Sequence, residues 1–309
     1  MDWNTVEAKI VQDDQNKWDQ KSSGKELCVA TSGRLQLSDG NGGGNAYALS
    51  DLATTQICQK LEIPVPYYRR LSDEMKACVA NYDLGRLKDK SYLLRGKGDW
   101  IRSFLSEEYV AYDNSRIAAS VRDLLNGGAV SIKTFVLEES HMFLKIISDE
   151  IVDQVSDLKA GIMVGNSEVG LGSVSVEPFV FRKPCTNDLI VAREKSFRHA
   201  HIHLTAHELS RRMAEAISES FRVASDILDA FLRTHEDPIS DPLETIRKLA
   251  EERKLSQKFT DEVVSGYLVE PEATRFGVIN AFTRAAQGLA PLQRIEMERF
   301  AGTLLETHL

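Results

Sequence analysis

The spacing of hydrophobic and polar residues divides this chain of 309 residues into three sections. Residues 1–25 are polar with occasional apolar positions, and they predict one short N-terminal helix. Residues 26–203 carry short apolar and β-branched runs between Gly, Pro and Asn, a pattern typical of strands joined by turns. Residues 204–309 place apolar side chains three and four positions apart, which predicts helices. The sequence therefore predicts an α+β fold, with a mixed, mostly antiparallel sheet, flanking helices and a helical C-terminal region.

Caps and apolar spacing locate the individual helices. A small helical insert is expected at 48–90, where Ser50 can cap a helix that reaches Leu61 and a second helix covers 73–81. An apolar stripe from Leu209 to Phe231 predicts one long helix, and such a stripe is typical of a core or a subunit interface. Further helices are predicted at 114–125, 242–254, 256–268, 274–287 and 291–306.

The middle section contains the predicted strands. Gly96 and Gly98 form a natural hairpin tip between two apolar runs, 91–95 and 100–105. A second hairpin is predicted from the runs 27–31 and 34–37. The remaining β-rich runs lie at 129–137, 142–147, 161–164, 173–182 and 189–192.

Composition limits the class of protein. Apolar residues make up 42% of the chain, yet no run approaches the roughly 18 residues that a membrane span needs. The four cysteines are far apart and form no CxxC pair, which is typical of free thiols in a reducing compartment. Since the N-terminus also lacks a secretory pattern, we expect a soluble cytoplasmic protein without a membrane partner.

Charge is unevenly distributed along the chain, although its net value is −8. Residues 60–102 hold ten Lys or Arg against six acids, whereas residues 204–309 hold 13 basic and 18 acidic residues. A basic segment of this kind can bind a polyanion. The alternative is that helices of mixed charge simply face solvent.

Two aromatic residues accompany the basic segment. Tyr109 and Tyr112 follow Arg102 closely, and aromatic rings beside arginines suit single-stranded nucleic acid, because rings stack on bases and cations contact phosphates. The same side chains also make good packing pairs between strands. Both interpretations remain open from the sequence.

Four histidines form a second candidate site. His199, His201 and His203 alternate, so a strand would point them to one face at a spacing that metal ligands can use, and His207 follows one turn later. The HExxH order is absent, so a divalent metal is one interpretation and ordinary polar histidines at a helix start are the other. No cofactor is otherwise indicated.

The loop that contains Asn166, Ser167, Glu168 and Gly170 is the third candidate. Glycine here allows close approach of the backbone, and Glu168 could serve as an acid or base if distant residues surround it. A turn-stabilising carboxylate is the alternative. Because neither GxSxG nor a P-loop occurs in the chain, we predict no catalytic residues.

Several short motifs together resemble the DUF932 family of phage- and plasmid-borne proteins of uncharacterised function. They occur in the family's order across roughly residues 45 to 305, and they are Ile101–Ser106 with Tyr112-Asp113-Asn114, Asn166–Gly170, Cys185-Thr186-Asn187-Asp188-Leu189, and Asn280–Thr283 with Ala301-Gly302. Asp188 stands where glycine is common in the family.

The resemblance implies a mobile-element protein and no established enzyme class. A strand-rich core with a helix between hairpins is also similar to the Rad52-like single-strand annealing proteins, an analogy of fold alone. That analogy implies a homo-oligomer whose long helix supports self-assembly, with bases stacking on Tyr109 or Tyr112. Its phosphate contacts would be Arg69, Arg70, Arg86, Lys88, Arg95, Lys97 and Arg102.

Three hypotheses follow. The first is an oligomeric, non-enzymatic protein that binds and anneals single-stranded DNA in recombination. The second is a metal-dependent enzyme acting on nucleic acid or a nucleotide through the four histidines. The third is a scaffolding or defence-related module that binds another protein. We expect three parts in any of these cases: a helical segment 1–25, a core 26–203 and a helical region 204–309.

Overall fold

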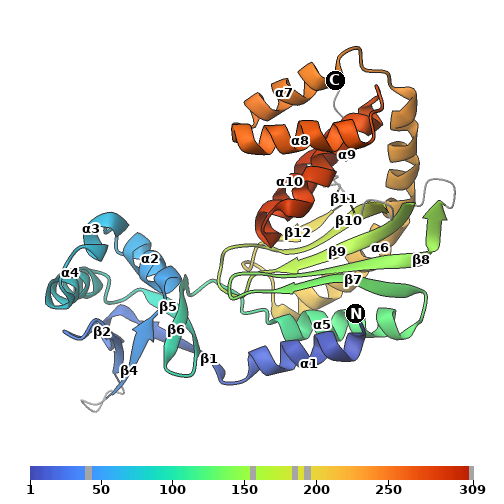
Figure 1. Ribbon diagram of the computed structural model, residues 1–309. Helices are drawn as coiled ribbons and strands as arrows, with labels where there is room; N and C mark the ends of the chain where they lie inside the picture. Colours follow the sequence, from blue (N-terminus) through green and yellow to red (C-terminus); the bar gives the residue numbers. More distant parts are fainter. Residues whose placement is uncertain (39–43, 154–157, 183–186, 191–195, 306–309) are drawn as a thin grey trace.

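Two six-stranded sheets organise the chain into two α+β units, which confirms the predicted fold class (Figure 1). The computed structural model describes residues 1–38, 44–153, 158–182, 187–190 and 196–305. We call residues 17–106 the small unit, and residues 3–14 with 107–305 the large unit. The sequence led us to expect one sheet. Two form because the small unit closes a hydrophobic core of its own, which is built entirely from its own residues.

The small unit has its helices α2 and α4 packed against strands of the sheet. The strand order is β1-β5-β6-β4-β3-β2, and the sheet is mixed because β4 pairs with β6 in parallel while the other pairs are antiparallel. Its elements are β1 (Lys17–Ser23), β2 (Leu27–Val29), β3 (Leu35–Ser38), β4 (Gly44–Leu49), α2 (Asp51–Lys60), α3 (Val65–Arg69), α4 (Asp73–Arg86), β5 (Ser91–Lys97) and β6 (Trp100–Ser106). Ser50 caps α2 by accepting a hydrogen bond from the N–H of Ala53, as predicted.

Strand β1 differs from the helix expected over residues 1–25. Only Trp3–Asp14 is helical, and Lys17–Ser23 pairs along its whole length with β5. The strand is polar because it forms an edge of the sheet, so its sequence lacks the apolar run typical of a central strand. The ring of Trp18 lies over Gly96. A Cβ atom at position 96 would stand 2.1 Å from that ring.

The large unit is a sheet with helices on both faces (Figure 1). The strand order is β11-β10-β9-β8-β7, all antiparallel, and β12 pairs with the other end of β10. Its helices are α1 (Trp3–Asp14), α5 (Asn114–Asn126), α6 (Ala206–Arg233), α7 (Pro242–Glu252), α8 (Gln257–Val269), α9 (Arg275–Ala285) and α10 (Pro291–Thr303). Its strands are β7 (Val130–Leu137), β8 (Met142–Asp153), β9 (Leu158–Asn166), β10 (Val174–Arg182), β11 (Asn187–Ile190) and β12 (Phe197–His199).

The apolar stripe of α6 is buried inside the chain. Leu209, Met213 and Ile217 pack with α1, α5 and one face of the sheet, while Phe231 belongs to the core shared with the C-terminal helices. The stripe was predicted to face either a core or another subunit. The structure shows the first of these, so α6 does not have this face free for self-assembly.

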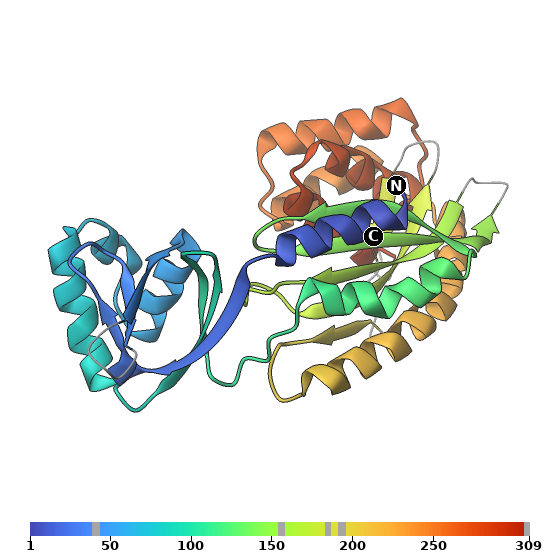
Figure 2. The ribbon, with the colours of Figure 1, turned by 90° about the horizontal axis from the view of Figure 1, so that it is seen from below.

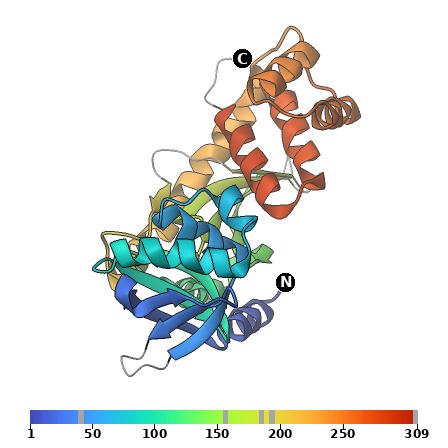
Figure 3. The ribbon, with the colours of Figure 1, turned by 90° about the vertical axis from the view of Figure 1, so that its left-hand side faces the viewer.

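The chain passes between the two units twice. It enters the small unit directly after α1, through Asn16, and returns through residues 107–113 into α5 (Figure 2). Seen from the side of the small unit, α2, α3 and α4 lie on the outside of its sheet (Figure 3). The small unit contributes β1, β5, β6 and Gln56 of α2 to the junction, and the large unit contributes the loop that follows β9.

Candidate functional site

Glu168 lies at the junction of the two units, in the loop that follows β9. Only 3% of this residue is exposed. One carboxylate oxygen accepts hydrogen bonds from Lys17 Nζ at 2.8 Å and Arg102 Nη1 at 3.0 Å, both from the small unit. The other accepts the backbone N–H of Asn114 at 2.8 Å, at the first residue of α5. Glu168 thus joins both units and the segment that connects them.

The backbone of the same loop is also bound to the small unit. Arg95 donates to the carbonyl oxygen of Glu168 at 2.9 Å, and Gln56 of α2 donates to that of Val169 at 2.8 Å. Tyr109 donates its hydroxyl to the carbonyl oxygen of Ser167 at 2.9 Å. Because three consecutive carbonyl groups find donors here, the loop is held in place by its main chain as well as by Glu168.

Asn166 and Gly170 define the two ends of this loop. The Asn166 amide donates to the carbonyl oxygen of Tyr112 and to the side-chain oxygen of Asn114, both at 2.9 Å. Gly170 has φ +80°, and a Cβ atom there would stand 2.6 Å from Leu105 Cδ2. The position therefore requires glycine for its left-handed backbone and for the close approach of β6.

A β-bulge places Arg102 at this site. The pairing of β5 with β6 runs from Arg95 opposite Ser103 to Gly96 opposite Ile101, so Arg102 is the extra residue. A bulge redirects a side chain and is common beside functional sites. Arg102 is buried and pairs with both Glu168 and Glu139.

The electrostatics of the junction keep its groups charged. Burial by itself would lower the pKa of Lys17, but the carboxylates of Glu168 and Asp13 outweigh burial, and the pKa of Lys17 is raised. The pKa of Arg102 is likewise raised by Glu139 and Glu168 against the opposing effect of burial. Burial raises the pKa of Tyr109, so its hydroxyl stays protonated and donates. Lys17 and Arg102 thus stay charged beside their carboxylate partners, and Tyr109 joins this closed network as a neutral donor.

This network leaves little capacity for acid–base chemistry. Both oxygens of Glu168 are occupied by donors, and Arg95 pairs with Asp19 and Asp113 in addition to the loop carbonyl. A general base needs a free lone pair directed at a substrate proton. The arrangement instead holds the two units together, which agrees with the alternative that Glu168 is a structural carboxylate that stabilises the turn.

The residues predicted to contact nucleic acid fall into two groups. Tyr112 is fully buried, and Arg95 and Arg102 are buried in the closed network. Tyr109 is partly buried, with its ring stacked on His201. Lys97 is partly exposed and binds Asp13 at 2.8 Å. The exposed members are Arg69, Arg70, Arg86 and Lys88, all in the small unit. Tyr112 packs in the core, and Arg95 and Arg102 form ion pairs at the junction.

The four histidines do not lie on one strand. His199 ends β12. His201 is buried, donates from Nδ1 to the carbonyl oxygen of Val110 and stacks on Tyr109 at 4.8 Å. His203 has φ +67°, and His207 lies in the first turn of α6. The backbone turns after His199, so the alternation is broken. Burial lowers the pKa of His201 to about 4. Across the described parts of the chain, no cluster of three or more His, Cys, Asp or Glu side chains has the geometry of a metal site.

The family-like motif Cys185–Leu189 leads to another buried ionic cluster. Cys185 lies outside the described residues, and Asn187 begins β11. Asp188 is fully buried and binds Lys133 and Lys145, and Lys145 also binds Glu298 of α10 at 2.6 Å. Burial alone would raise the pKa of Asp188, but the two lysines lower it. This cluster ties α10 to the sheet.

Sequence reasoning missed the partners that complete these networks. Lys17 lies in a strand that was expected to be helical, and Gln56 lies in a helix with no distinguishing pattern. Lys145 carried one signal, since it is a charged residue inside an otherwise apolar strand. A charge at such a position needs a buried partner, which would have pointed to a distant carboxylate.

Exposed aromatic rings gather on the small unit. Among the residues that the structure describes, the exposed aromatic side chains are Tyr67, Tyr82 and Trp100, the last with 53% exposure. A groove of about 650 Å³ runs beside Trp100, between β4, the β2–β3 turn and helices α2 to α4. Arg34, Arg69 and Lys76 line it together with Asp51 and Asp73.

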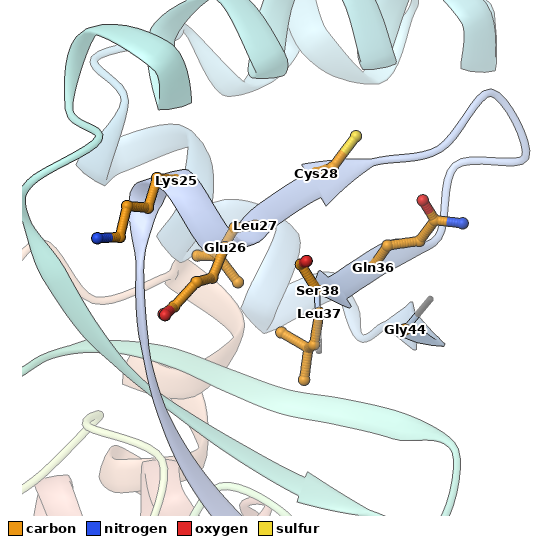
Figure 4. Close-up of a pocket in the computed structure, with 8 residues that line it drawn as sticks. All are labelled: Lys25, Glu26, Leu27, Cys28, Gln36, Leu37, Ser38 and Gly44. Atoms are coloured by element: carbon orange, nitrogen blue, oxygen red, sulfur yellow. The ribbon is translucent and has the colours of Figure 1, made fainter. Parts of the chain in front are cut away.

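A separate pocket of about 360 Å³ lies over β2 and β3 of the same unit (Figure 4). Lys25 and Glu26 contribute opposite charges, and its exposed strand residues are Cys28, Gln36, Ser38 and Gly44. It has no aromatic lining. Trp100 and the side chains of Arg34, Arg69 and Lys76 thus lie at the groove and not at this pocket.

Comparison with known proteins found no matching protein-family model, no matching curated protein and no matching solved structure. A search of the described helices found none with the length and apolar character required to cross a bilayer.

Proposed function

We propose that the chain is a non-enzymatic protein that binds single-stranded nucleic acid through its small unit, in a phage or plasmid context as its family-like motifs imply. The observation that carries this proposal is the separation of charge between the units. Residues 17–106 hold 14 Lys or Arg and 10 Asp or Glu, a net charge of +4, so the rest of the chain carries −12. The net charge of −8 is therefore the sum of a basic small unit and a strongly acidic remainder of the chain.

The groove beside Trp100 is the proposed contact surface. An exposed indole provides a face on which a base can stack, and Arg34, Arg69 and Lys76 can contact the phosphates on either side. Arg69 and exposed Asp51 form a long ion pair, with 3.9 Å between Nη2 and Oδ1. Such an exposed pair contributes about 0–1 kcal/mol, so a phosphate can replace the carboxylate at little cost.

The junction network supports this proposal indirectly. It fixes β5 and β6, and thus the hairpin that carries Trp100, against the large unit. A stacking residue on a fixed hairpin loses less entropy on binding than one on a free loop. The buried Arg95 and Arg102 act in this proposal by supporting the hairpin.

Fluorescence anisotropy with a labelled single-stranded oligonucleotide, measured over a series of salt concentrations, tests the proposal. We expect binding that weakens steeply with salt, and a loss of about tenfold or more for Trp100→Ala, since one stacked base contributes about 1–3 kcal/mol. Trp100→Phe retains an aromatic ring and should bind more tightly than Trp100→Ala. Arg69→Ala removes one of the proposed phosphate contacts. Its matched control is Arg212→Ala, which removes an exposed arginine of α6. Absence of binding at low salt would contradict the proposal.

Self-association is the second part of the proposal, because annealing requires two strands to be presented together. Its surface must differ from the buried stripe of α6. Sizing with light scattering, in the presence and absence of the oligonucleotide, measures it. A monomer under both conditions would remove annealing from the proposal and leave binding alone.

A further inference from the structure

The outer face of α4 carries a row of exposed apolar side chains. Met75 is 48% exposed and Tyr82 71%, and exposed Cys78 lies between them in the sequence. Residues three, four and seven positions apart share one face of a helix, so these side chains form one row. The opposite face of α4 is buried in the core of the small unit through Ala77, Ala80 and Leu84. The row therefore lies on the solvent side of α4, at the end of the small unit that is remote from the large unit (Figure 1).

Gly85 extends this row by one turn. It is an exposed residue inside α4, and among the described residues no neighbouring element comes within 4 Å of the position that its Cβ atom would take. Glycine inside an exposed helix costs about 1 kcal/mol relative to alanine. Contacts within the described chain give no steric reason for that cost. A missing side chain at this position does allow another helix to approach α4 closely.

The row is complementary to itself. Its members are spaced three, four and three residues apart, which is the spacing of the contact positions in paired helices. In a two-fold symmetric pair, residue i of one copy contacts residue j of the other, and j contacts i. For antiparallel helices with the axis beside position 80, Cys78 meets Tyr82 and Met75 meets Gly85. Each large side chain would then pack against a smaller residue of the other copy.

The charges of α4 also favour the antiparallel direction. Exposed Glu74 lies in the first turn, whereas exposed Arg86 and Lys88 lie at the other end. Antiparallel pairing brings Glu74 of one copy beside these two cations of the other. Arg86 pairs within its own helix with Asp83 at 3.0 Å, yet 68% of its side chain is exposed and available to a second carboxylate. Parallel pairing would instead bring like charges together and set Tyr82 against Tyr82.

We propose that two copies of this chain pair through the row Met75, Cys78, Tyr82 and Gly85, with their α4 helices antiparallel. The pair supplies the self-association surface that α6 does not offer, and in this role it rests on the proposed function, which requires two strands to be presented together. The groove beside Trp100 stays open in the pair, because its α4 residues, Asp73 and Lys76, lie on other faces of the helix. One dimer thus presents two grooves.

The contact area sets the expected strength of the dimer. The 14 residues of α4 span about 21 Å. A stable interface buries about 800 Å² per partner, which is more than one face of such a helix provides. We therefore expect a reversible dimer with a dissociation constant of about 10–100 µM.

Sedimentation equilibrium and light scattering of the full chain, from about 5 to 500 µM and without nucleic acid, measure this dimer. Tyr82→Ser and Gly85→Leu should each weaken it about tenfold or more, the first by removing the largest apolar contact and the second by blocking close approach. Gly85→Leu should also raise the unfolding temperature, because leucine favours a helix more than glycine does. Trp100→Ala, which removes an exposed ring outside the row, should pair as the unchanged protein does.

Charge exchange tests the direction of the helices. Glu74→Lys, and separately the double variant Arg86→Glu with Lys88→Glu, should each be monomeric at about 100 µM because like charges then face each other. An equal mixture of the two should form a dimer again, since each repulsive contact becomes an attractive one. Glu252→Lys, at an exposed position of α7, is the matched control and should pair normally.

Three outcomes would overturn the proposal: a strict monomer at about 500 µM, a dimer that Tyr82→Ser and Gly85→Leu leave unchanged, or a charge-exchanged mixture that stays monomeric. Oligonucleotide binding by the same variants separates this result from the proposed function. A chain that pairs as expected but binds no oligonucleotide at low salt supports the pairing surface and contradicts only nucleic-acid binding.

Discussion

At the scale of single residues, Glu168 has the largest structural role that we identify. A buried carboxylate is costly unless it is paired, and here two cations and one backbone N–H occupy its oxygens. Its partners come from β1, β6 and α5, which are far apart in the sequence. The side chain of Glu168 therefore holds β1, β6 and α5 in position around the loop that follows β9.

Replacement of Glu168 tests this role. Glu168→Ala leaves Lys17, Arg102 and the Asn114 N–H without their common acceptor, so we expect a loss of about 3 kcal/mol in the free energy of unfolding. Glu168→Gln should lose less, because its amide oxygen can still accept from Asn114. Urea unfolding followed by tryptophan fluorescence and circular dichroism measures both. Glu262→Ala, an exposed carboxylate on α8, should change stability by less than about 0.5 kcal/mol. Equal stability of Glu168→Ala and Glu262→Ala would contradict the assignment.

At the scale of elements, turns and bulges align the helices and strands at the junction. The turn at Gly170 lets the loop approach β6, and the bulge at Arg102 directs a cation toward that loop. Both features depend on one backbone position each. The regular parts of the elements on either side have ordinary caps and spacing, such as the Thr205–Glu208 capping box that begins α6.

Alanine at Gly170 separates backbone strain from close approach. Gly128 has φ +77° with no atom near its Cβ position, whereas Gly170 has φ +80° with Leu105 Cδ2 at 2.6 Å. Gly128→Ala should therefore cost about 1 kcal/mol from the left-handed backbone alone. Gly170→Ala should cost about 1–3 kcal/mol more, because overpacking at β6 is added. Thermal unfolding of both variants is the measurement, and equal losses would show that the approach to β6 is unimportant.

At the scale of the whole molecule, two units of opposite net charge share one buried junction. The chain crosses it twice, and the ionic network joins β1, β5, β6 and α5 to the loop after β9. Because these contacts are buried, added salt screens them less than it screens surface pairs. The basic unit is thus held at a fixed position on an acidic one.

This junction predicts that the units unfold together. Differential scanning calorimetry of the unchanged protein should show one transition whose calorimetric and van't Hoff enthalpies agree. In Glu168→Ala the shared network is weakened, and we expect two transitions or a van't Hoff enthalpy below the calorimetric one. Glu262→Ala should retain the single transition. Two transitions in the unchanged protein would mean that the network does not couple the units.

Local signals were sufficient for most elements. The helices α2, α5, α6 and α8 lie within a few residues of their predicted positions, as does the hairpin of β5 and β6. Local reasoning failed at Lys17–Ser23, since a polar edge strand has no apolar period to detect. It also could not show that Tyr112 is buried, because a tyrosine near arginines has the same sequence pattern in a core and at a binding surface.

The sequence by itself determined the α+β class, most of the helices, the central strands of the hairpins, the uneven charge and the short motifs, because these depend on local periodicity and on composition. Only the tertiary structure decided that two separate sheets form, that Glu168, Arg102 and Asn114 from three motifs meet, and that the basic residues divide into a buried group and an exposed group. These outcomes depend on contacts between distant residues. Such contacts are set by which hydrophobic faces close on one another, and no local pattern records that pairing.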